Sequence, residues 1–217
     1  MPTIAFVSSK GGVGKTTSAL LLALGLAERG LTASLVDSDP NLPLTSWAER
    51  PGKPDQISLF HAATFQDLPA ALRSAKRGSD WVIVDTEGGA PRMGGMAIAN
   101  ADLVITPLAA SALEVREALK IARLTGEVSR KEGRPIAFTC LFSRTPAGVR
   151  RSFQAVRAVL QTEGLPILST VLSDKEAFRA IFSDGGSLAD LNPRRVSGLK
   201  SARALAADFT EEVYGRF

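Results

Sequence analysis

The stretch Lys10-Gly-Gly-Val-Gly-Lys-Thr-Thr17 is the most informative part of this sequence. It follows Thr3–Ser8, a β-branched and aromatic run that predicts a strand, and it leads into Thr16–Arg29, an apolar run that predicts a helix. Its glycines allow the backbone to fold tightly and to turn successive N–H groups toward an anion. The amino end of the helix adds partial positive charge at the same point. The stretch therefore predicts a phosphate-binding loop between a strand and a helix.

The side chains of this loop suit a nucleotide bound together with a divalent cation. Lys15 is expected to reach the β- and γ-phosphates, the Thr16 hydroxyl to ligate Mg²⁺, and Thr17 to donate to the α-phosphate. The strict form of the pattern has glycine at position 9, where this chain has Ser9. ATP and Mg²⁺ are the expected cofactors. The expected nucleotide-binding residues are Gly11, Gly12, Val13, Gly14, Lys15, Thr16, Thr17 and, after a later strand, Arg144.

Two acidic segments follow apolar runs later in the chain. Asp37-Ser-Asp39-Pro40 follows Thr32–Val36, and Asp85 closes Trp81–Val84. The carboxyl ends of parallel strands meet at one edge of a sheet, so these carboxylates are expected near the phosphate loop. An aspartate after a strand often only caps a turn, but Asp85 here has the Walker B arrangement, which holds Mg²⁺ through water. The loop and both acidic segments, in this order, make a specific signal.

Short apolar runs alternate with helical stretches along the chain. Further strands are predicted at Leu103–Thr106 and Ile136–Phe142, each a continuous apolar run typical of a strand buried on both faces. Ser111-Ala-Leu-Glu114 and Ser173-Asp-Lys-Glu176 both fit a capping box, and the first opens a helix expected to end near Gly133. The alternation predicts a three-layer α/β P-loop NTPase fold, with a mostly parallel central sheet flanked by helices.

The composition suits one soluble domain over residues 1–217. Hydrophobic residues make up 45% and charged residues 22%, and no apolar run is long enough to cross a membrane. Cys140 is the only cysteine and no leader pattern is evident, so a cytoplasmic location is expected. Trp47, Trp81 and Cys140 are expected in the core. The net charge of +4, with its cations in excess over residues 111–217, permits but does not demonstrate polyanion binding.

A lysine directly before the double glycine, Lys10, defines the deviant Walker A class. With it the loop resembles the ParA/MinD superfamily of ATPases, and the resemblance covers nearly the whole chain. It implies that Lys10 crosses to the nucleotide of a partner subunit in an ATP-bound sandwich dimer. The match to the family's Asp-x-Asp-Pro pattern implies that Asp39 orients the attacking water and that Asp37 assists at the Mg²⁺ site. The implied catalytic residues are Lys10, Lys15 and Asp39, and the implied metal site is Thr16, Asp37 and Asp85.

Two later segments extend this resemblance. The stretch Thr86-Glu-Gly-Gly89 lies where family members carry a switch that senses the γ-phosphate, and its form resembles small ParA-like proteins tied to plasmid and T-DNA transfer. Glu87 is a weaker candidate for the catalytic base than Asp39, because the family does not use that position so. The adenine base is expected near Phe142-Ser-Arg-Thr145.

The implied function is ATP-dependent positioning of a plasmid, chromosome or other cargo. The resemblance implies nonspecific DNA binding by an ATP-dependent homodimer, association with the nucleoid, and stimulation by a partner of ParB type or a cargo adaptor. The larger plasmid ParA proteins carry a helix-turn-helix ahead of the first strand; none is seen here, so repression at a specific operator is not expected.

Cations in the second half of the chain are the candidates for DNA contacts. Apolar residues at helical spacing (Val149, Phe153, Val156 and Leu160) leave Arg150 and Arg157 on a solvent side beside Arg151. A solvated basic surface is the plainer interpretation, and the resemblance favours phosphate contacts. The expected DNA-binding residues are Arg194, Arg195, Lys200 and Arg203.

Two other functions stay open. A MinD-like membrane-cycling ATPase ends in a basic amphipathic helix, whereas the segment Asp208–Phe217 is acidic where it should attract anionic lipid, so no membrane partner is expected. A ligase resembling dethiobiotin synthetase shares the fold and a similar loop, although the double threonine and the Asp-x-Asp-Pro pattern favour the ParA type. A nitrogenase-type iron protein is excluded, because one cysteine cannot hold its cluster.

Overall fold

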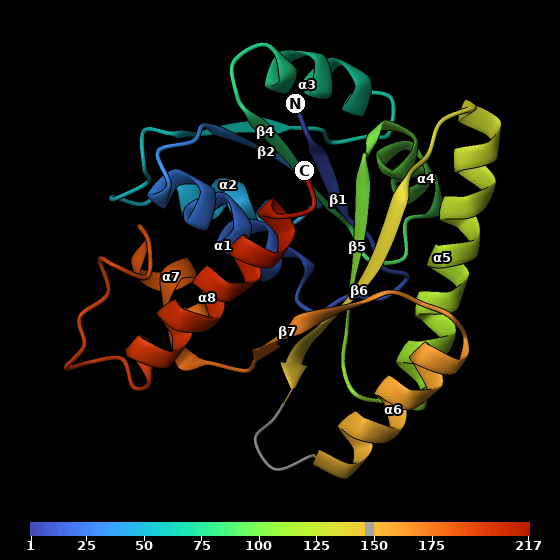
Figure 1. Ribbon diagram of the computed structural model, residues 1–217. Coiled ribbons are helices and arrows are strands. Elements are labelled where there is room, and N and C mark those ends of the chain that lie inside the picture. The colour runs from blue at the N-terminus through green and yellow to red at the C-terminus, as the bar shows by residue number, and fades with distance from the viewer. Residues whose placement is uncertain (146–149) are drawn as a thin grey trace.

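The structure, a computed structural model, describes residues 1–145 and 150–217. Within them one sheet of seven parallel strands has the order β3-β2-β4-β1-β5-β6-β7 (Figure 1). The strands are β1 (Thr3–Phe6), β2 (Ala33–Ser38), β3 (Ile57–His61), β4 (Trp81–Thr86), β5 (Leu103–Leu108), β6 (Ala137–Thr145) and β7 (Ile167–Ser173). The helices are α1 (Lys15–Glu28), α2 (Pro43–Ala48), α3 (Leu68–Lys76), α4 (Pro91–Asn100), α5 (Ala112–Glu132), α6 (Arg150–Thr162), α7 (Glu176–Asp184) and α8 (Leu199–Tyr214).

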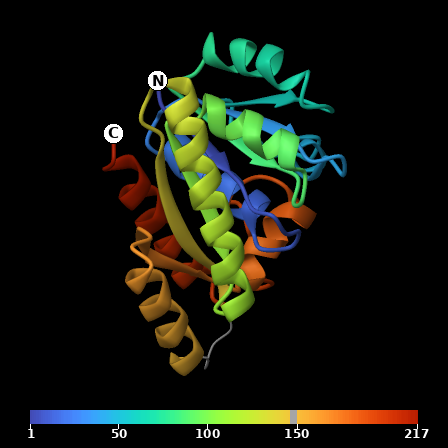
Figure 2. The same ribbon diagram turned by 90° about the vertical axis from the view of Figure 1, so that its right-hand side faces the viewer.

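Helices cover both faces of the sheet, which confirms the predicted three-layer α/β fold (Figures 1 and 2). Ile4 and Phe6 of β1 belong to a cluster formed with α1, α2, α7 and α8. Ala5 and Val7, which point the other way, belong to a cluster formed with α3, α4 and α5. A strand covered on both faces needs apolar residues in succession, and this explains why β1 shows no polar alternation.

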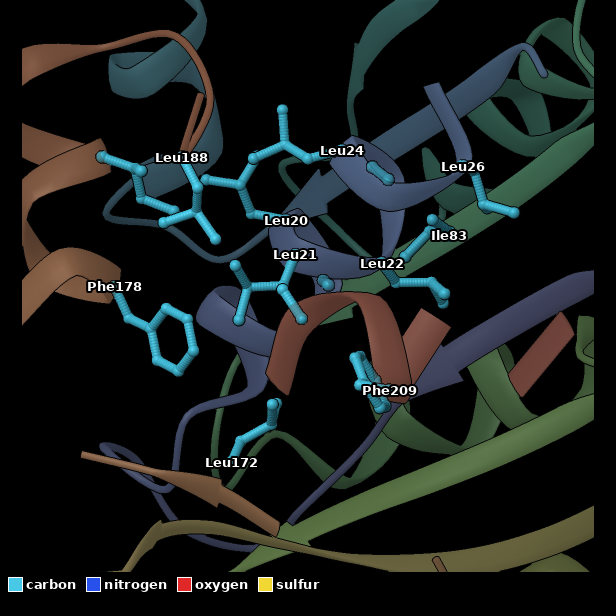
Figure 3. Packing of buried hydrophobic residues seen from close by; sticks show 14 of the residues in the cluster. Leu20, Leu21, Leu22, Leu24, Leu26, Ile83, Leu172, Phe178, Leu188 and Phe209 are labelled. Carbon is cyan, nitrogen blue, oxygen red and sulfur yellow. The ribbon is translucent and has the colours of Figure 1, made fainter. Parts of the chain in front are cut away.

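Helix α1 is apolar on nearly every side because it lies between the sheet and α8. Figure 3 shows five of its buried leucines among side chains from the sheet, α7 and α8, namely Leu20, Leu21, Leu22, Leu24 and Leu26. Helix α8 approaches α1 closely at Gly25, where a β-carbon would lie 2.1 Å from the Thr210 hydroxyl. This packing fixes α1, and with it the loop at its amino end.

Strands β3 and β7 were not predicted from the sequence. Both are the outer strands of the sheet, and both mix polar with apolar residues, as in Ile57-Ser-Leu-Phe-His61 and Ile167-Leu-Ser-Thr-Val-Leu-Ser173. The exposed side of an edge strand does not require an apolar residue, so the continuous apolar run that identified the inner strands is absent.

The two predicted capping boxes have different outcomes. At the start of α5 the Ser111 hydroxyl accepts from the Glu114 N–H at 3.4 Å, as predicted, but the Glu114 carboxylate accepts from Lys10, and the Ser111 N–H donates to the Ala109 carbonyl at 2.8 Å instead. Helix α5 ends at Glu132, with Gly133 as its C-cap residue. The box at Ser173–Glu176 is wrong, because β7 continues through Ser173 and α7 begins only at Glu176. The Glu176 carboxylate instead accepts from the Ser197 hydroxyl at 2.7 Å.

Several expectations about burial are confirmed. Trp47, Trp81 and Cys140 are buried. In α6, Val156 and Leu160 are buried and Phe153 packs against the same cluster. The expected start of that stripe, Val149, lies outside the described residues, as do the side chains of Arg150 and Arg151. Among the helices that the structure describes, none combines the length and the apolar character that a membrane crossing requires.

Candidate functional site

The phosphate loop predicted from the sequence connects β1 to α1 at the carboxyl edge of the sheet. Because β1 pairs with β4 on one side and β5 on the other, the loop starts near the middle of this edge. Gly12 and Gly14 have φ angles of 75° and 96°, which other residues adopt only with strain. Gly14 is the residue before α1, so the helix begins at Lys15 and its free N–H groups and dipole face the loop.

Lys15 is buried although its side chain is charged, with 5% of the residue exposed. Its Nζ donates to the Ser8 hydroxyl at 3.2 Å and to the Lys10 carbonyl oxygen at 3.0 Å. Burial lowers the pKa of Lys15, while three nearby carboxylates, Asp85 first among them, act in the opposite direction. The ammonium group is thus held within the loop by loop oxygens and lies beside a group of carboxylates.

Asp85 lies in β4, next to the loop. Its Cα is in register with Phe6 of β1 on one side and with Asp37 of β2 on the other. The residue is fully buried, and neither carboxylate oxygen has a hydrogen-bond partner among the described residues. Burial raises the pKa of Asp85 to about 7, although the nearby Thr16 hydroxyl and Lys15 ammonium both lower it. A buried carboxylate without partners beside a threonine hydroxyl offers the oxygen ligands that Mg²⁺ prefers.

The two aspartates after β2 have different surroundings. Asp37 is buried, and its Oδ2 accepts from the backbone N–H groups of Leu44 at 3.0 Å and Thr45 at 2.9 Å, so it caps the first turn of α2. Its role at a metal stays a prediction. Asp39 is half-buried and lines the pocket above the loop. Its Oδ1 accepts from the backbone and side-chain N–H groups of Asn41, both at 2.9 Å.

One wall of this pocket comes from the end of β6. The Ser143 hydroxyl donates to the Val13 carbonyl at 2.5 Å, and Arg144 Nη1 donates to the Gly12 carbonyl at 2.5 Å. Arg144 has a φ of 49°, which is unusual for a residue with a side chain and turns the chain at the pocket. The structure therefore places Ser143 and Arg144 against the loop, in the segment where the sequence predicted contacts to a base.

Another part of the lining comes from β7 and α7, for which no role in a pocket was expected from the sequence. It contains Leu172, Ser173, Asp174, Phe178 and Arg179. Arg179 forms an ion pair with Asp174, and this pair and the buried Phe178 ring line the same pocket. The only local signal was a charged and aromatic cluster directly after a strand. That signal is weak, because β7 itself was not recognised.

Lys10 extends away from the pocket that its neighbours line. Its Nζ forms an ion pair with Glu114 Oε1 at 2.9 Å, and the adjacent Ser9 hydroxyl donates to Glu117. Lys10 is not among the residues that line the pocket, whereas Gly11, Gly12, Gly14 and Lys15 are. The lysine that distinguishes this loop is therefore held by α5.

The family described as VirC1 protein matches residues 1–213 of this chain. The chain belongs to the VirC1 family. Protein ParA of Rhizobium radiobacter is 31% identical over 210 residues, which cover 95% of each chain. Protein virC1 of the same organism is 31% identical over 190 residues, which cover 85% of this chain and 82% of that protein.

Solved structures share the fold of this chain. Apo McdA from Cyanthece superimposes with a TM-score of 0.76 at 17% sequence identity, covering 98% of this chain and 99% of the other. Cell-division ATPases of the MinD type share the fold as well. These structures confirm the P-loop NTPase fold, and the ParA and virC1 relatives place the chain in the ParA/MinD superfamily.

Gly88, shortly after β4 in this VirC1-family chain, packs directly against the backbone of the phosphate loop. A β-carbon on Gly88 would lie 2.4 Å from the Lys10 carbonyl group and 2.4 Å from the Gly11 nitrogen. The neighbouring atoms belong to the backbone of the phosphate loop, which cannot move aside as a flexible side chain can. The segment after β4, where the sequence predicted a switch, therefore touches the loop without any side chain between them.

We expect Gly88→Ala to lower the affinity for ATP by about tenfold or more. The added methyl group overlaps backbone atoms of Lys10 and Gly11, so the phosphate loop must shift to accommodate it. Isothermal titration with ATP and Mg²⁺ measures the affinity. Gly95→Ala is the matched control, since Gly95 lies in α4 and a β-carbon there meets nothing within 4 Å. Equal ATP affinities of the two variants would contradict the contact.

The cations expected to bind DNA gather before and within the first turns of α8. Arg194, Arg195 and Lys200 are exposed. Arg203 is also exposed, but its guanidinium donates to the carbonyls of Leu188 at 2.9 Å and Ala189 at 3.1 Å. Arg203 therefore helps to hold the preceding loop of this VirC1-family chain, whereas the other three cations face solvent.

Proposed function

We propose that this chain is an ATPase that positions cargo in the manner of ParA. The observation that carries the proposal is the juxtaposition of Lys15, a buried ammonium at the start of α1, and Asp85, a buried carboxylate without a hydrogen-bond partner among the described residues. Buried charges cost free energy unless they are paired. Nucleotide phosphates supply the counter-charge for Lys15, and Mg²⁺ supplies it for Asp85.

The residues present fit ATP and Mg²⁺. Bound Mg²⁺ would neutralise charge on the β- and γ-phosphate oxygens. In this proposal Thr16 and Asp85 hold the ion, and Lys15 contacts the phosphates together with the N–H groups of the loop and of the first turn of α1. Asp39, half-buried at the pocket, orients the water that attacks the γ-phosphate. The base lies between the wall that contains Arg144 and the wall formed by α7.

The wider function is proposed from the relatives. The relatives include a maintenance of carboxysome distribution protein and a probable plasmid-partitioning protein, and one solved structure with the same fold is an McdA–ATP complex. We propose that this chain forms an ATP-dependent homodimer, binds DNA without sequence preference, and positions a plasmid, chromosome or other cargo. A partner of ParB type or a cargo adaptor stimulates hydrolysis. Binding to the nucleoid follows from the proposed DNA binding and has the same test.

The first test is DNA binding. We expect two unrelated duplexes to be shifted equally in a gel when ATP is present and neither to be shifted when it is absent. The dimer doubles the number of phosphates neutralised, and each contact adds about 0.9 to the log–log salt slope on duplex DNA. Combined Arg194→Glu, Arg195→Glu and Lys200→Glu substitutions should weaken binding to both duplexes alike, because phosphates carry no sequence information.

Combined Arg73→Glu, Lys76→Glu and Arg77→Glu substitutions are the charge-matched control for this test, because these three exposed cations lie at the end of α3, on the opposite face of the sheet from α8. Arg203 is left unchanged because its contacts to the loop carbonyls would confuse loss of binding with loss of structure. A preference for one duplex, or no shift at low salt with ATP, would contradict the proposed DNA binding.

Two alternatives share the ATP site. In α8, Asp208, Glu211 and Glu212 occupy the part that a MinD-like membrane helix would need basic, and Glu211 forms an ion pair with Arg29. A cobyrinic acid a,c-diamide synthase with bound ADP and magnesium shares the fold, so a ligase stays possible on the fold alone. ATP hydrolysis that increases with added DNA favours the ParA type over both alternatives.

A further inference from the structure

The first two turns of α5 carry two carboxylates that contact the phosphate loop from more than a hundred residues away in the sequence. Glu114 Oε1 accepts from Lys10 Nζ at 2.9 Å, and Glu117 accepts from the Ser9 hydroxyl. The side chains of Glu114 and Glu117 are only 12% and 16% exposed. These contacts join the start of α5 to the beginning of the loop.

The carboxylates of Glu114 and Glu117 differ in the partners that stabilise their negative charge. Glu117 has a second partner, because its Oε1 accepts from Lys120 Nζ at 2.9 Å. Among the described residues, Glu114 forms its ion pair with Lys10. A carboxylate that has lost most of its water is stable as an anion only beside a cation or several donors. The Lys10–Glu114 ion pair therefore matters to both groups, whereas the Ser9–Glu117 hydrogen bond is one of two for Glu117.

The backbone and the side chain of Lys10 contact different parts of the molecule. The Lys10 carbonyl accepts from Lys15 Nζ at 3.0 Å, and the same peptide touches Gly88, so the backbone belongs to the phosphate site. The side chain extends to Glu114 and does not line the pocket. Any contact between the Lys10 ammonium and a phosphate therefore requires that the Lys10–Glu114 ion pair opens first.

We propose that Glu114 is the positioning residue for Lys10. In the free subunit it holds the Lys10 ammonium at the start of α5, and the lysine reaches a phosphate only by exchanging this carboxylate for it. The second half of the inference rests on the proposed function, because the phosphate in question belongs to the nucleotide of the ATP-bound dimer. The strength of the ion pair then sets how readily the subunits assemble.

The direct test measures the chemical reactivity of the Lys10 amine and does not require the subunits to assemble. The full chain without nucleotide is treated briefly with acetic anhydride, and acetylation of each lysine is followed by peptide mass spectrometry. We expect Lys10 to react about fivefold faster in Glu114→Gln than in the wild type, because the amine is no longer held in the ion pair and is free to meet the reagent. Glu127→Gln, an exposed glutamate later in α5, should leave the rate at Lys10 unchanged. An unchanged rate at Lys10 in Glu114→Gln overturns the proposal.

A second variant guards against a purely structural effect. Glu114→Asp retains the charge on a shorter side chain and should give a rate at Lys10 between those of the wild type and Glu114→Gln. Lys53, whose Nζ donates to the Ile57 carbonyl at 2.7 Å, serves as an internal reference far from α5 in the sequence. If Lys53 accelerates as much as Lys10 does, the variant has loosened the whole fold and the proposal fails.

The assembly half is tested separately by sedimentation velocity with ATP and Mg²⁺. Glu114→Gln should dimerise at a protein concentration several-fold lower than the wild type requires, because no ion pair has to open. Dimerisation identical to that of the wild type overturns this half. If Lys10 becomes more reactive while neither protein dimerises at all, the positioning role stands and the dimer of the proposed function is wrong.

Discussion

Replacing Lys15 with alanine should raise the dissociation constant for ATP by at least about 1,000-fold, which corresponds to about 4 kcal/mol. Lys15 is the buried cation of the loop, its ammonium is already held in place by the Ser8 hydroxyl and the Lys10 carbonyl, and burial has removed much of its water. A charge with this little solvent screening contributes far more to phosphate binding than an exposed lysine would. Isothermal titration with ATP and Mg²⁺ is the measurement.

Lys76→Ala provides the comparison for Lys15→Ala, because it removes an exposed lysine of α3. Its ATP affinity should equal that of the wild type. The Lys15 variant also leaves Asp85 without its nearest cation, so its thermal unfolding must be recorded to show that it is folded. A folded Lys15→Ala protein that binds ATP with normal affinity would disprove the phosphate-loop assignment.

Asp39→Asn should reduce ATP hydrolysis by a factor of about 100 or more while ATP binding is retained. Positioned general bases contribute about 10² to 10⁴ in rate, and Asp39 lines the pocket without taking part in the loop itself. The protein should consequently accumulate in its ATP-bound form. Phosphate release measures the rate, and filter binding of labelled ATP measures what is retained.

Two nearby acidic residues, Asp37 and Glu87, provide comparison variants for Asp39→Asn. Asp37→Asn should chiefly lower stability, by about 1 kcal/mol, because Asp37 accepts from the N–H groups of Leu44 and Thr45 at the start of α2. Glu87→Gln should hydrolyse ATP at a rate close to that of the wild type. If Glu87→Gln loses activity and Asp39→Asn keeps it, the roles assigned to these two acids must be exchanged.

The sequence predicted the phosphate loop well because its determinants are local. Glycines that need positive φ angles, a lysine at the start of a helix and an apolar strand all lie within the first 30 residues, and each has a known structural consequence. The position of Asp85 beside the loop also followed from its place at the end of an apolar run. In the same way, the inner strands could be predicted because they are covered on both faces.

The rest depends on contacts between distant residues. Edge strand β7 is not a continuous apolar run, and without it the wall formed by Phe178 and Arg179 could not be placed beside the loop. The failed capping box at Ser173 has the same cause. The Lys10–Glu114 ion pair joins residues 104 positions apart, and no spacing rule relates a loop lysine to the first turn of a helix so far away.

The strand order also determines when this protein acquires its site during synthesis. Strand β1 and the loop leave the ribosome first, but both neighbours of β1 come from Trp81–Thr86 and Leu103–Leu108. At translation rates of about 5–20 residues per second, the wait of about 75 residues for β4 lasts about 4–15 s, and in that time β1 is apolar on both faces and unpaired along both edges. The walls that contain Arg144 and Phe178 appear later still. ATP therefore stabilises this domain only after β6, β7 and α7 have been made, and the segment from β1 to β4 is the part on which chaperones are expected to act before then.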